Sequence, residues 1–453
     1  MLTHPVILYG KKESSGPSKR LRVAFTTLGC KVNVYDTEMA AEQFRRAGYQ
    51  VVDFDQPADV YVINTCSVTN MGARKSRQMI RRAVNSHPEA VIVAMGCYSQ
   101  YAPDEVEAIA GVDVLLGTQG RKHIVELVEA ARQNKRRVNA VGTIMAERQF
   151  EELDALHFEG RTRAVLKVQD GCNEFCSYCQ IPWARGRNRS RLPERVIEQV
   201  RGLVRQGFPE IVLTGVHVGT YGEDLSPKTS LAALLREVAQ IPGVERLRLS
   251  SIDPHEVTDE LIEVMSANAS ICHHLHIPAQ SGEDGVLAAM RRRNTVQEYR
   301  KLVAQLRREI PDIAITTDII AGFPGESEES FQQTLAFCRE MKFNKIHAFP
   351  YSRRKGTKAD AMPGHLPRQV KQERARRLIA LSDELALEHH QALLDQTVTV
   401  LVEQPSDYAS KYVQGLTDTY VRVHLPGDGL EPGDFVQVRI VAAMVESVVA
   451  VIL

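Results

Sequence analysis

Short apolar runs alternate with helix-like segments over most of this chain, and this alternation restricts the possible fold more than any other feature. Four apolar runs, at residues 22–30, 58–66, 90–97 and 112–120, are typical of buried strands, and segments such as "DTEMAAEQFRRAG" separate them. Strands that alternate with helices form parallel sheets. We therefore expect an α/β protein that begins with an N-terminal parallel α/β sheet domain.

A second α/β region follows a charged connector at about residues 143–163. Six further strand-like runs lie at residues 163–170, 210–219, 245–253, 273–282, 313–326 and 344–352. Six βα units predict a central partial (β/α)6 barrel, with its working residues at the carboxyl ends of the strands. From about Gln391 the chain changes to short β-rich runs with Gly, Asp and Pro turns, which predicts a small all-β, OB-like barrel.

The length of 453 residues indicates more than one domain. We expect a basic, poorly ordered extension at residues 1–20, a first domain at 21–142, a barrel domain with a basic C-terminal helix at 160–390, and a β domain at 391–453. The first residues lack a secretory signal, and no apolar run reaches the ~20 residues that span a bilayer. We therefore expect a cytoplasmic protein that does not bind membranes.

Three cysteines lie in one short loop directly after the first predicted barrel strand. The segment "GCNEFCSYC" contains Cys172, Cys176 and Cys179, and three thiolates so spaced suit a single soft metal centre. A structural zinc site needs a fourth ligand, but no His or Cys occurs in the twenty residues after Cys179. We favour a 4Fe–4S cluster, because three cysteine ligands leave one iron open to a substrate or cofactor.

Cys30, Cys66 and Cys97 each end one of the first three predicted strands. Residues at the carboxyl ends of neighbouring parallel strands converge at one edge of the sheet, so we predict a second three-thiolate 4Fe–4S cluster there. The remaining two cysteines, Cys272 and Cys338, are expected to be buried structural thiols. In "CHHLH", a strand would send His273 and His274 to opposite faces, which argues against a zinc site.

The cysteine loop, with Tyr178 just before its last cysteine, resembles the signature of the radical S-adenosylmethionine (SAM) superfamily. The segments "TTLGCKVNVYDTE", "VINTCSVTN" and "AMGCYSQ" extend the likeness to the methylthiotransferase family, whose C-terminal domain is a TRAM domain. The segments "GCKVN", "NTCSVTN", "TTDIIAGFPGES" and "HAFPYSRRKGT" resemble the branch of that family that acts on N6-threonylcarbamoyladenosine in tRNA.

This resemblance implies insertion of a methylthio group at carbon 2 of N6-threonylcarbamoyladenosine next to the anticodon, with two 4Fe–4S clusters and two SAM per turnover. The implied partners are the tRNA anticodon stem-loop, a flavodoxin- or ferredoxin-like electron donor and a sulfur source. No side chain is assigned a catalytic role, because the clusters carry the chemistry. Three alternatives stay open: isopentenyladenosine in tRNA, a ribosomal protein aspartate, or a non-catalytic metal-bearing RNA-binding module.

Polar strand ends are the candidates for holding SAM. "TGV" takes the place of the glycine-containing motif of the superfamily after the second strand, although it departs from the commoner "GGE" form. The turn at residues 322–326 is expected to let the backbone approach the adenine, and Asn33 to line the cluster pocket. The SAM candidates are Tyr178, Thr214, Gly215, Ser251, Asp253 and Gln280, with Ser281.

Basic runs near predicted strand ends indicate a phosphate-binding rim. The C-terminal region departs from this pattern, because it contains three Lys/Arg and eight Asp/Glu from Gln391 onward. We predict that it contributes a small stacking patch, while residues 353–377, with Arg374, Arg376 and Arg377, supply most of the charge. The rim comprises Arg74, Lys75, Arg77, Arg81 and Arg82; Arg185, Arg187, Arg189 and Arg191; residues 291–293; and Arg353, Arg354, Lys355 and Lys358. The patch comprises Lys411, Tyr412, Tyr420 and Arg422.

Overall fold

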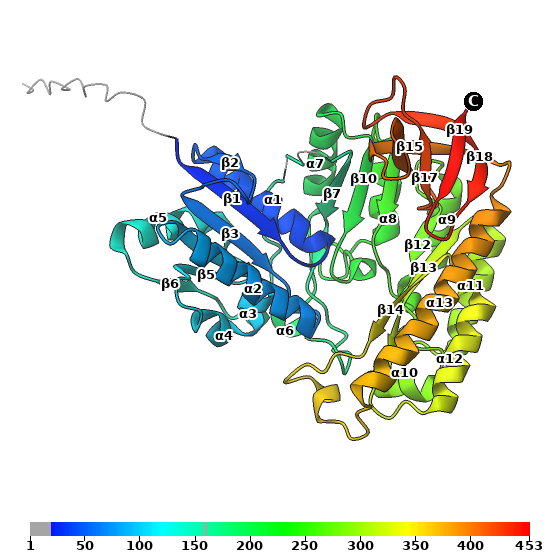
Figure 1. Ribbon diagram of the computed structural model, residues 1–453, viewed down its shortest axis with the longest axis horizontal. Coiled ribbons are helices and arrows are strands. Elements are labelled where there is room, and N and C mark those ends of the chain that lie inside the picture. The colour runs from blue at the N-terminus through cyan, green and yellow to red at the C-terminus, as the bar shows by residue number, and fades with distance from the viewer. Residues whose placement is uncertain (1–19, 156, 159–160) are drawn as a thin grey trace, which may run out of the picture.

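The computed structural model describes residues 20–155, 157–158 and 161–453. The N-terminal sheet, the central barrel and the small C-terminal barrel follow one another along the chain, and the two barrels pack together (Figure 1). The expected extension at residues 1–20 lies outside the described residues except for Arg20. Within the described ranges, no helix is both long and apolar enough to cross a membrane.

The N-terminal sheet is parallel throughout, as predicted, but it has six strands instead of four. The strands not predicted, β2 and β6, have only three residues each and lie at the two edges, where no long apolar run is needed. In spatial order the strands are β2 (Gln50–Val52), β1 (Arg22–Thr27), β3 (Val60–Thr65), β4 (Val91–Gly96), β5 (Val114–Leu116) and β6 (Val138–Ala140).

Helices cover both faces of this sheet because alternate strand residues point to opposite sides. Val60 and Val62 of β3 pack in the core that contains α1 and α5, whereas Tyr61 and Ile63 pack in the core that contains α2 and α4. The helices are α1 (Lys31–Arg46), α2 (Asn70–Ser86), α3 (Cys97–Tyr101), α4 (Pro103–Glu107) and α5 (Ile124–Asn134), with 3-10 turns at Arg121–His123 and Ile144–Ala146.

The central region is the predicted partial barrel of six parallel strands. Bridges between Leu247 and Ile271 and between Ser251 and His276 connect its two halves. Among the described residues β7 and β14 do not pair, so the barrel is open on the side next to α1. The strands are β7 (Arg163–Lys167), β10 (Glu210–Thr214), β11 (Arg246–Leu249), β12 (His274–His276), β13 (Ala314–Ala321) and β14 (Lys345–Pro350).

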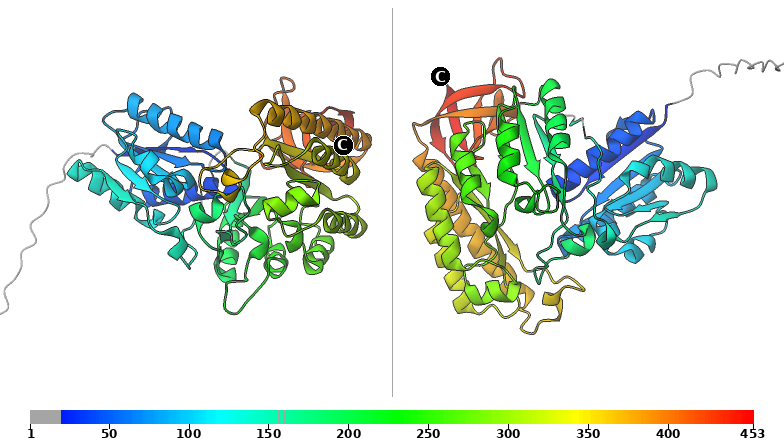
Figure 2. Two further views of the ribbon diagram at one scale, coloured as in Figure 1. Left: turned by 90° about the horizontal axis from the view of Figure 1, so that it is seen from below. Right: turned by 180° about the vertical axis from the view of Figure 1, so that it is seen from behind.

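Helices between these strands form the outer layer of the barrel, as both views in Figure 2 show. They bury one large core whose members come from nearly every strand and helix of the region. They are α7 (Pro193–Arg205), α8 (Leu231–Ala239), α9 (Asp259–Ala267), α10 (Asp284–Met290), α11 (Val296–Glu309) and α12 (Glu328–Met341), with 3-10 turns at Val218–Thr220, Pro254–Glu256 and Lys358–Ala361. After β7 the chain adds β8 (Gln169–Asp170), α6 (Ile181–Arg185) and β9 (Arg189–Ser190).

The long helix α13 (Arg368–Ala392) leads to a closed five-stranded barrel, which confirms the predicted small all-β domain of the TRAM type. Two buried arginines of β11 attach this barrel to the base of the central one. Arg246 donates to the carbonyls of Leu416 and Thr399, and Arg248 to those of Thr417 and Asp418. The strands are β15 (Thr397–Pro405), β16 (Tyr412–Thr417), β17 (Arg422–Pro426), β18 (Phe435–Ala443) and β19 (Val448–Ile452).

Candidate active site

The loop between β8 and α6 positions Cys172, Cys176 and Cys179 through its own backbone. The N–H of Glu174 points at the Cys172 Sγ and the N–H of Ile181 at the Cys179 Sγ, both at 3.4 Å. Hydrogen bonds from backbone N–H groups stabilise negative charge on sulfur, which favours thiolate ligands. The loop is therefore shaped to present its sulfurs together.

The chemistry of these three thiols fits a soft metal centre. Burial and the nearby Cys176 raise the pKa of Cys179 and the N–H of Ile181 lowers it, which together puts it at about 12. The pKa of Cys172 is also raised, first by burial and then by Cys179 and Cys176, against the N–H of Glu174. Three such thiols stay protonated near pH 7 unless a metal takes their charge, and iron–sulfur clusters bind to thiolates of this kind.

The structure also brings Cys30, Cys66 and Cys97 together. They follow β1, β3 and β4, which are neighbours in the sheet. Glycines leave room beside Cys66: an added Cβ at Gly29 or Gly72 would lie 3.2 or 3.3 Å from its Sγ. Burial raises the pKa of Cys97 to about 12, Arg185 lowers it, and Cys30 and Cys66 raise it. This second set therefore also fits a cluster bound by three thiolates.

Arg185 connects the two thiol sets. It follows Cys179 by six residues in the sequence, and its Nε lies 3.2 Å from the Cys97 Sγ. The same guanidinium donates to the Asn33 side-chain oxygen at 2.6 Å and to Asp36 at 2.8 Å. Asn33, expected to line the cluster pocket, also lies within 3.7 Å of the Cys97 Sγ. One buried arginine thus joins the cysteine loop to the edge of the N-terminal sheet.

Two buried carboxylates balance this arginine. Asp36 and Asp170 both pair with Arg185, and Lys167 Nζ lies 2.6 Å from Asp36 and 3.0 Å from Asp170. Burial alone would raise the pKa of Asp36, but Arg121, Lys167 and Arg185 outweigh it and hold that pKa below its usual value. The network is therefore permanently charged in the neutral range.

The prediction that the arginines after Cys179 form part of a phosphate-binding rim is wrong for three of the four. Arg185, Arg189 and Arg191 are fully buried, and Arg187 alone of this run is exposed. Arg191 pairs with Glu152 and Asp154 of the connector. Arg185 and Arg191 are buried because their carboxylate partners come from distant parts of the chain, which local charge in a sequence does not reveal. Arg189 instead donates to the nearby carbonyls of Arg185 and Arg187.

The predicted SAM-binding residues lie at the carboxyl ends of the barrel strands. Thr214 and Gly215 end β10, and Ser251 and Asp253 follow β11. Gln280, after β12, has a positive φ of 68° and forms a bridge to Ile319. Tyr178, in the cysteine loop, packs in the cluster that contains Phe323 of the predicted turn at residues 322–326. Ser281 is buried beside Thr334.

His217 and Arg292 join these strand ends, and sequence reasoning missed both in this role. Asp253 accepts from Arg292 at 2.7 Å and contacts His217 at 3.1 Å, and Arg292 also donates to the Pro278 carbonyl. Arg292 reaches the Cys176 Sγ at 3.9 Å. Arg292 belongs to the basic run at residues 291–293, which we predicted to bind phosphate. The sequence therefore pointed to this arginine, but its partner is the Asp253 carboxylate.

Glu256 lies beside His217 and Asp253 and has a strongly shifted pKa. Burial raises the pKa of Glu256, His217 lowers it and Asp253 raises it, and the result is about 7. For His217, burial lowers the pKa, but the hydrogen bond to Asp253 and the charge of Glu256 raise it above its usual value. The strand ends around Asp253 therefore change charge near neutral pH.

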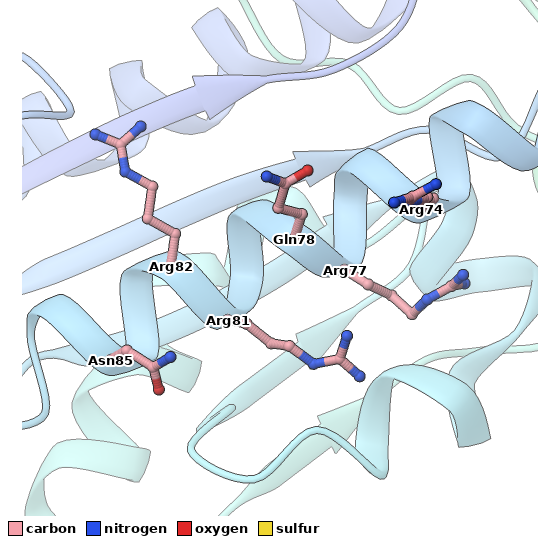
Figure 3. A pocket seen from close by; sticks show the side chains of 6 residues that line it. All are labelled: Arg74, Arg77, Gln78, Arg81, Arg82 and Asn85. Atoms are coloured by element: carbon pink, nitrogen blue, oxygen red, sulfur yellow. The ribbon is translucent and has the colours of Figure 1, made fainter.

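The basic face of α2 is exposed. Arg74, Arg77, Arg81 and Arg82, with Gln78 and Asn85, line a shallow pocket of about 580 Å³ (Figure 3). Arg77 and Arg82 pair with Glu105 and Asp55, whereas within the described ranges Arg74, Lys75 and Arg81 form no ion pair. This face therefore keeps several cations available to an anionic ligand.

The first turn of α2 contacts the loop after β14. Asn70 binds Ser352 and the Arg353 carbonyl, and exposed Lys355 and Lys358 follow in that loop. Two predicted rim or charge-supplying residues are instead structural and buried: Arg354 binds Gln180 and Asn70, and Arg374 pairs with Glu326.

The predicted stacking patch on the C-terminal barrel does not exist as one patch. Tyr412 pairs with Pro426 at one end of the β16–β17 hairpin, and Arg422 pairs with Leu416 at the other. Tyr420 stacks on His274 at 4.8 Å between ring centroids, facing the central barrel. The prediction failed because the hairpin separates residues that are close in sequence.

The remaining cysteines agree with their sequence interpretation, whereas the expectation of satisfied histidines fails for His274, whose Nδ1 has no hydrogen-bond partner among the described residues. Cys272 and Cys338 are buried in the fold. His274 is buried against Tyr420, whereas the neighbouring His273 binds Asp312 near the surface. The pair therefore points to opposite sides, as a strand requires.

The fold and the cysteine loop define a radical SAM protein, and comparison with known proteins agrees. The Radical SAM superfamily profile matches residues 166–338, and the profile described as uncharacterized protein family UPF0004 matches residues 22–117. A radical SAM methyltransferase, TsrM from Kitasatospora setae, has a similar fold, with a TM-score of 0.56 and 16% identity over 75% of this chain and 77% of that one.

Two relatives identify the family more closely. The threonylcarbamoyladenosine tRNA methylthiotransferase MtaB of Bacillus subtilis is 47% identical over 93% of this chain and 94% of its own length. The tRNA-2-methylthio-N(6)-dimethylallyladenosine synthase of Moorella thermoacetica is 38% identical over 92% and 95%. The chain belongs to the radical SAM tRNA methylthiotransferase family.

Proposed function

We propose that this protein inserts a methylthio group at carbon 2 of N6-threonylcarbamoyladenosine in tRNA. The observation that carries the proposal is the contact of Arg185 with Cys97, because it joins the segment after the cysteine loop to the strand end that contains the second thiol set. Replacing a ring hydrogen by a sulfur group requires the radical source and the sulfur donor to reach the same carbon. Close positioning of the reacting groups is most of what a protein can contribute to such a step.

Cys172, Cys176 and Cys179 hold one 4Fe–4S cluster, and Cys30, Cys66 and Cys97 hold the other. When bound, these clusters and SAM supply the radical, the sulfur and the methyl group. The side chains at the strand ends bind and orient SAM, with Arg292 and His217 keeping the Asp253 carboxylate ionised. The three architectures correspond to domains at residues 21–142, 160–390 and 391–453. The protein acts in the cytoplasm with a flavodoxin- or ferredoxin-like electron donor and a separate sulfur source.

The exposed cations support an RNA substrate. Arg74, Lys75 and Arg81 lie on α2, whose first turn contacts the loop after β14 that contains Lys355 and Lys358. This helix starts four residues after Cys66, and the loop binds Gln180, the residue after Cys179. Cations without carboxylate partners gain most from phosphate contacts, because no ion pair must be broken first. The anticodon stem-loop would bind across these two elements.

The higher identity to a threonylcarbamoyladenosine enzyme than to a dimethylallyladenosine enzyme supports the choice of nucleoside. The test is anaerobic turnover of the reconstituted protein with SAM, a reductant and tRNA from cells that lack this gene, followed by mass spectrometry of the nucleosides. A methylthio increment on threonylcarbamoyladenosine is expected. An increment on isopentenyladenosine instead, or none despite SAM cleavage, would overturn the proposal.

A further inference from the structure

A cavity of about 360 Å³ lies where the open side of the central barrel meets α1 and the C-terminal barrel. Its walls include strand residues of the barrel and the first residue of α1, Lys31, which directly follows Cys30. One wall of the cavity is therefore formed by the residue next to a predicted ligand of the second cluster. It is lined by Lys31, His274, His276, Thr316, His347 and Tyr420, among others.

Lys31 is a cation of this cavity that forms no ion pair within the described residues. Its Nζ lies 5.7 Å from the centroid of the Tyr420 ring, and within the described residues no carboxylate forms an ion pair with it. Two nearby carboxylates, those of Asp318 and Asp383, contact other residues instead. Asp318 contacts His276 at 3.3 Å, and Lys345, which also lines the cavity, pairs with Asp383. Glu446 is the one acidic residue in the lining itself.

A second polar group of the cavity also lacks a partner. His274 is buried and its Nε2 contacts Thr316, but its Nδ1 forms no hydrogen bond. A buried polar atom of this kind is costly unless a ligand or water binds it. The cation without an ion pair lies in a wall that also contains this unsatisfied histidine, and it indicates a ligand with an anionic group.

The field in the cavity is positive. Burial would raise the pKa of Tyr420, but Lys31, Arg163 and Arg248 lower it below its usual value. The pKa of His274 is far below its usual value because of burial and because Arg248, His276, Lys31 and His347 disfavour a further charge. Such surroundings favour an anion over a neutral or cationic ligand.

We propose that this cavity binds the amino-acid side chain of the modified adenosine and that Lys31 pairs with its carboxylate. The inference rests on the proposed function. A carbamoyl link spans about 3.8 Å, the length of a peptide unit. The carboxylate therefore lies well away from the adenine ring, and it can occupy the cavity while carbon 2 of the ring faces the thiols. An isopentenyl group has no charge and would leave Lys31 unpaired in the cavity, so the same lysine would select against it.

The test compares three anticodon stem-loop RNAs that differ only at the target base: threonylcarbamoyladenosine, its threoninol analogue without the carboxylate, and unmodified adenosine. Binding to the reconstituted full-length protein is measured by fluorescence anisotropy. The wild type is expected to prefer the carboxylate over the threoninol RNA by about 10- to 100-fold, the range for a hydrogen bond to a charged group. Lys31→Gln is expected to remove that preference, and Lys31→Arg to retain most of it.

Two controls separate local from general effects. Lys345→Gln removes a cation of the same cavity that already has a carboxylate partner, so it should retain most of the preference. Arg81→Gln lies on the exposed face of α2 and should weaken all three RNAs equally. Melting temperatures of the variants confirm folding.

An equal affinity of the wild type for the two modified RNAs, or a preference that survives in Lys31→Gln, overturns the inference. A phosphate in the cavity would give the first of these results, because all three RNAs have the same phosphates. If the wild type still forms the methylthio product in that case, only the assignment of the cavity fails. If no product forms on any nucleoside, the proposed function fails with it.

Discussion

Cys172, Cys176 and Cys179 come from one loop of eight residues, whereas Cys30, Cys66 and Cys97 come from three different strands of the N-terminal sheet. The first set is shaped by its own backbone, with N–H groups pointing at two of its sulfurs. The second set meets only because β1, β3 and β4 are parallel neighbours. The loop therefore depends on local spacing, while the strand-end set depends on the register of a whole sheet.

The two sets also differ in the charges around them. Beside the strand-end set, Asp36 and Asp170 keep lowered pKa values and stay ionised with Arg185 and Lys167. Beside the loop, Glu256 has a pKa of about 7 and changes charge in the neutral range.

The largest effect is expected from removing one thiol of each set. Cys176→Ala should abolish SAM cleavage, whereas Cys66→Ala should retain SAM cleavage but form no methylthio product. In both variants the iron content should fall from about eight to about four per chain, since each cluster holds four irons. Iron analysis and an assay for 5′-deoxyadenosine measure these outcomes. Loss of SAM cleavage in Cys66→Ala would show that the sets are not separate in function.

Arg185→Met tests the connection between the sets. It leaves Asp36 and Asp170 buried with one cation fewer, and loss of one partner in a buried ion network costs about 3–5 kcal/mol. The free energy of unfolding in urea should fall by that order, and the iron held by the strand-end set should fall with it. Arg187→Gln is the matched control, because Arg187 is the exposed member of the same run. A change below about 1 kcal/mol in Arg185→Met would contradict a structural role.

The ionisation of Glu256 sharpens the electrostatic difference. The carboxyl has a pKa of about 7 in the fold against its usual value of 4.5, so its protonated form is favoured on folding. Its contribution is complete below about pH 4.5 and is lost as pH rises through about 7. Relative to wild type, Glu256→Gln should therefore gain about 1–3 kcal/mol of stability between pH 5 and pH 8. Unfolding curves across that range measure it, and a constant difference would contradict the raised pKa.

The smallest effect is expected outside both sets, on α2. Arg81→Gln should reduce tRNA affinity a few-fold and lower the slope of log affinity against log salt by about 0.7 to 0.9. SAM cleavage without RNA should not change. Arg308→Gln, an exposed substitution on the outer helix α11, is the control. An unchanged salt slope in Arg81→Gln would remove the basic face of α2 from the RNA-binding surface.

The sequence predicted the architecture well, because apolar periodicity and turn residues are local signals. It gave the parallel N-terminal sheet, the six strands of the open barrel and the closed C-terminal barrel. It missed β2 and β6, since three-residue edge strands need no apolar run. It also indicated that strand-end cysteines would converge, because adjacency of strand ends follows from parallel topology.

Burial of charge could not be predicted in the same way. Arg185 looked like a residue for binding phosphate until its partners were known, and Asp36 lies 149 residues away from it in the chain. Tyr420 looked like an exposed stacking residue, but it packs on His274 of the central barrel. Whether a charged or aromatic side chain faces water depends on contacts between distant segments, and a single sequence does not contain that information in local form.

The contact of Arg185 with Cys97 also limits how such a protein can evolve. A recombination that joined the N-terminal sheet of one relative to the barrel of another would separate Asn33 and Asp36 from the arginine that binds them. Unless the incoming barrel had an arginine at the same place, the hybrid would bury the aspartate with one cation fewer and the asparagine oxygen without the guanidinium that donates to it. The two regions must therefore be inherited as a pair, although each has a core of its own.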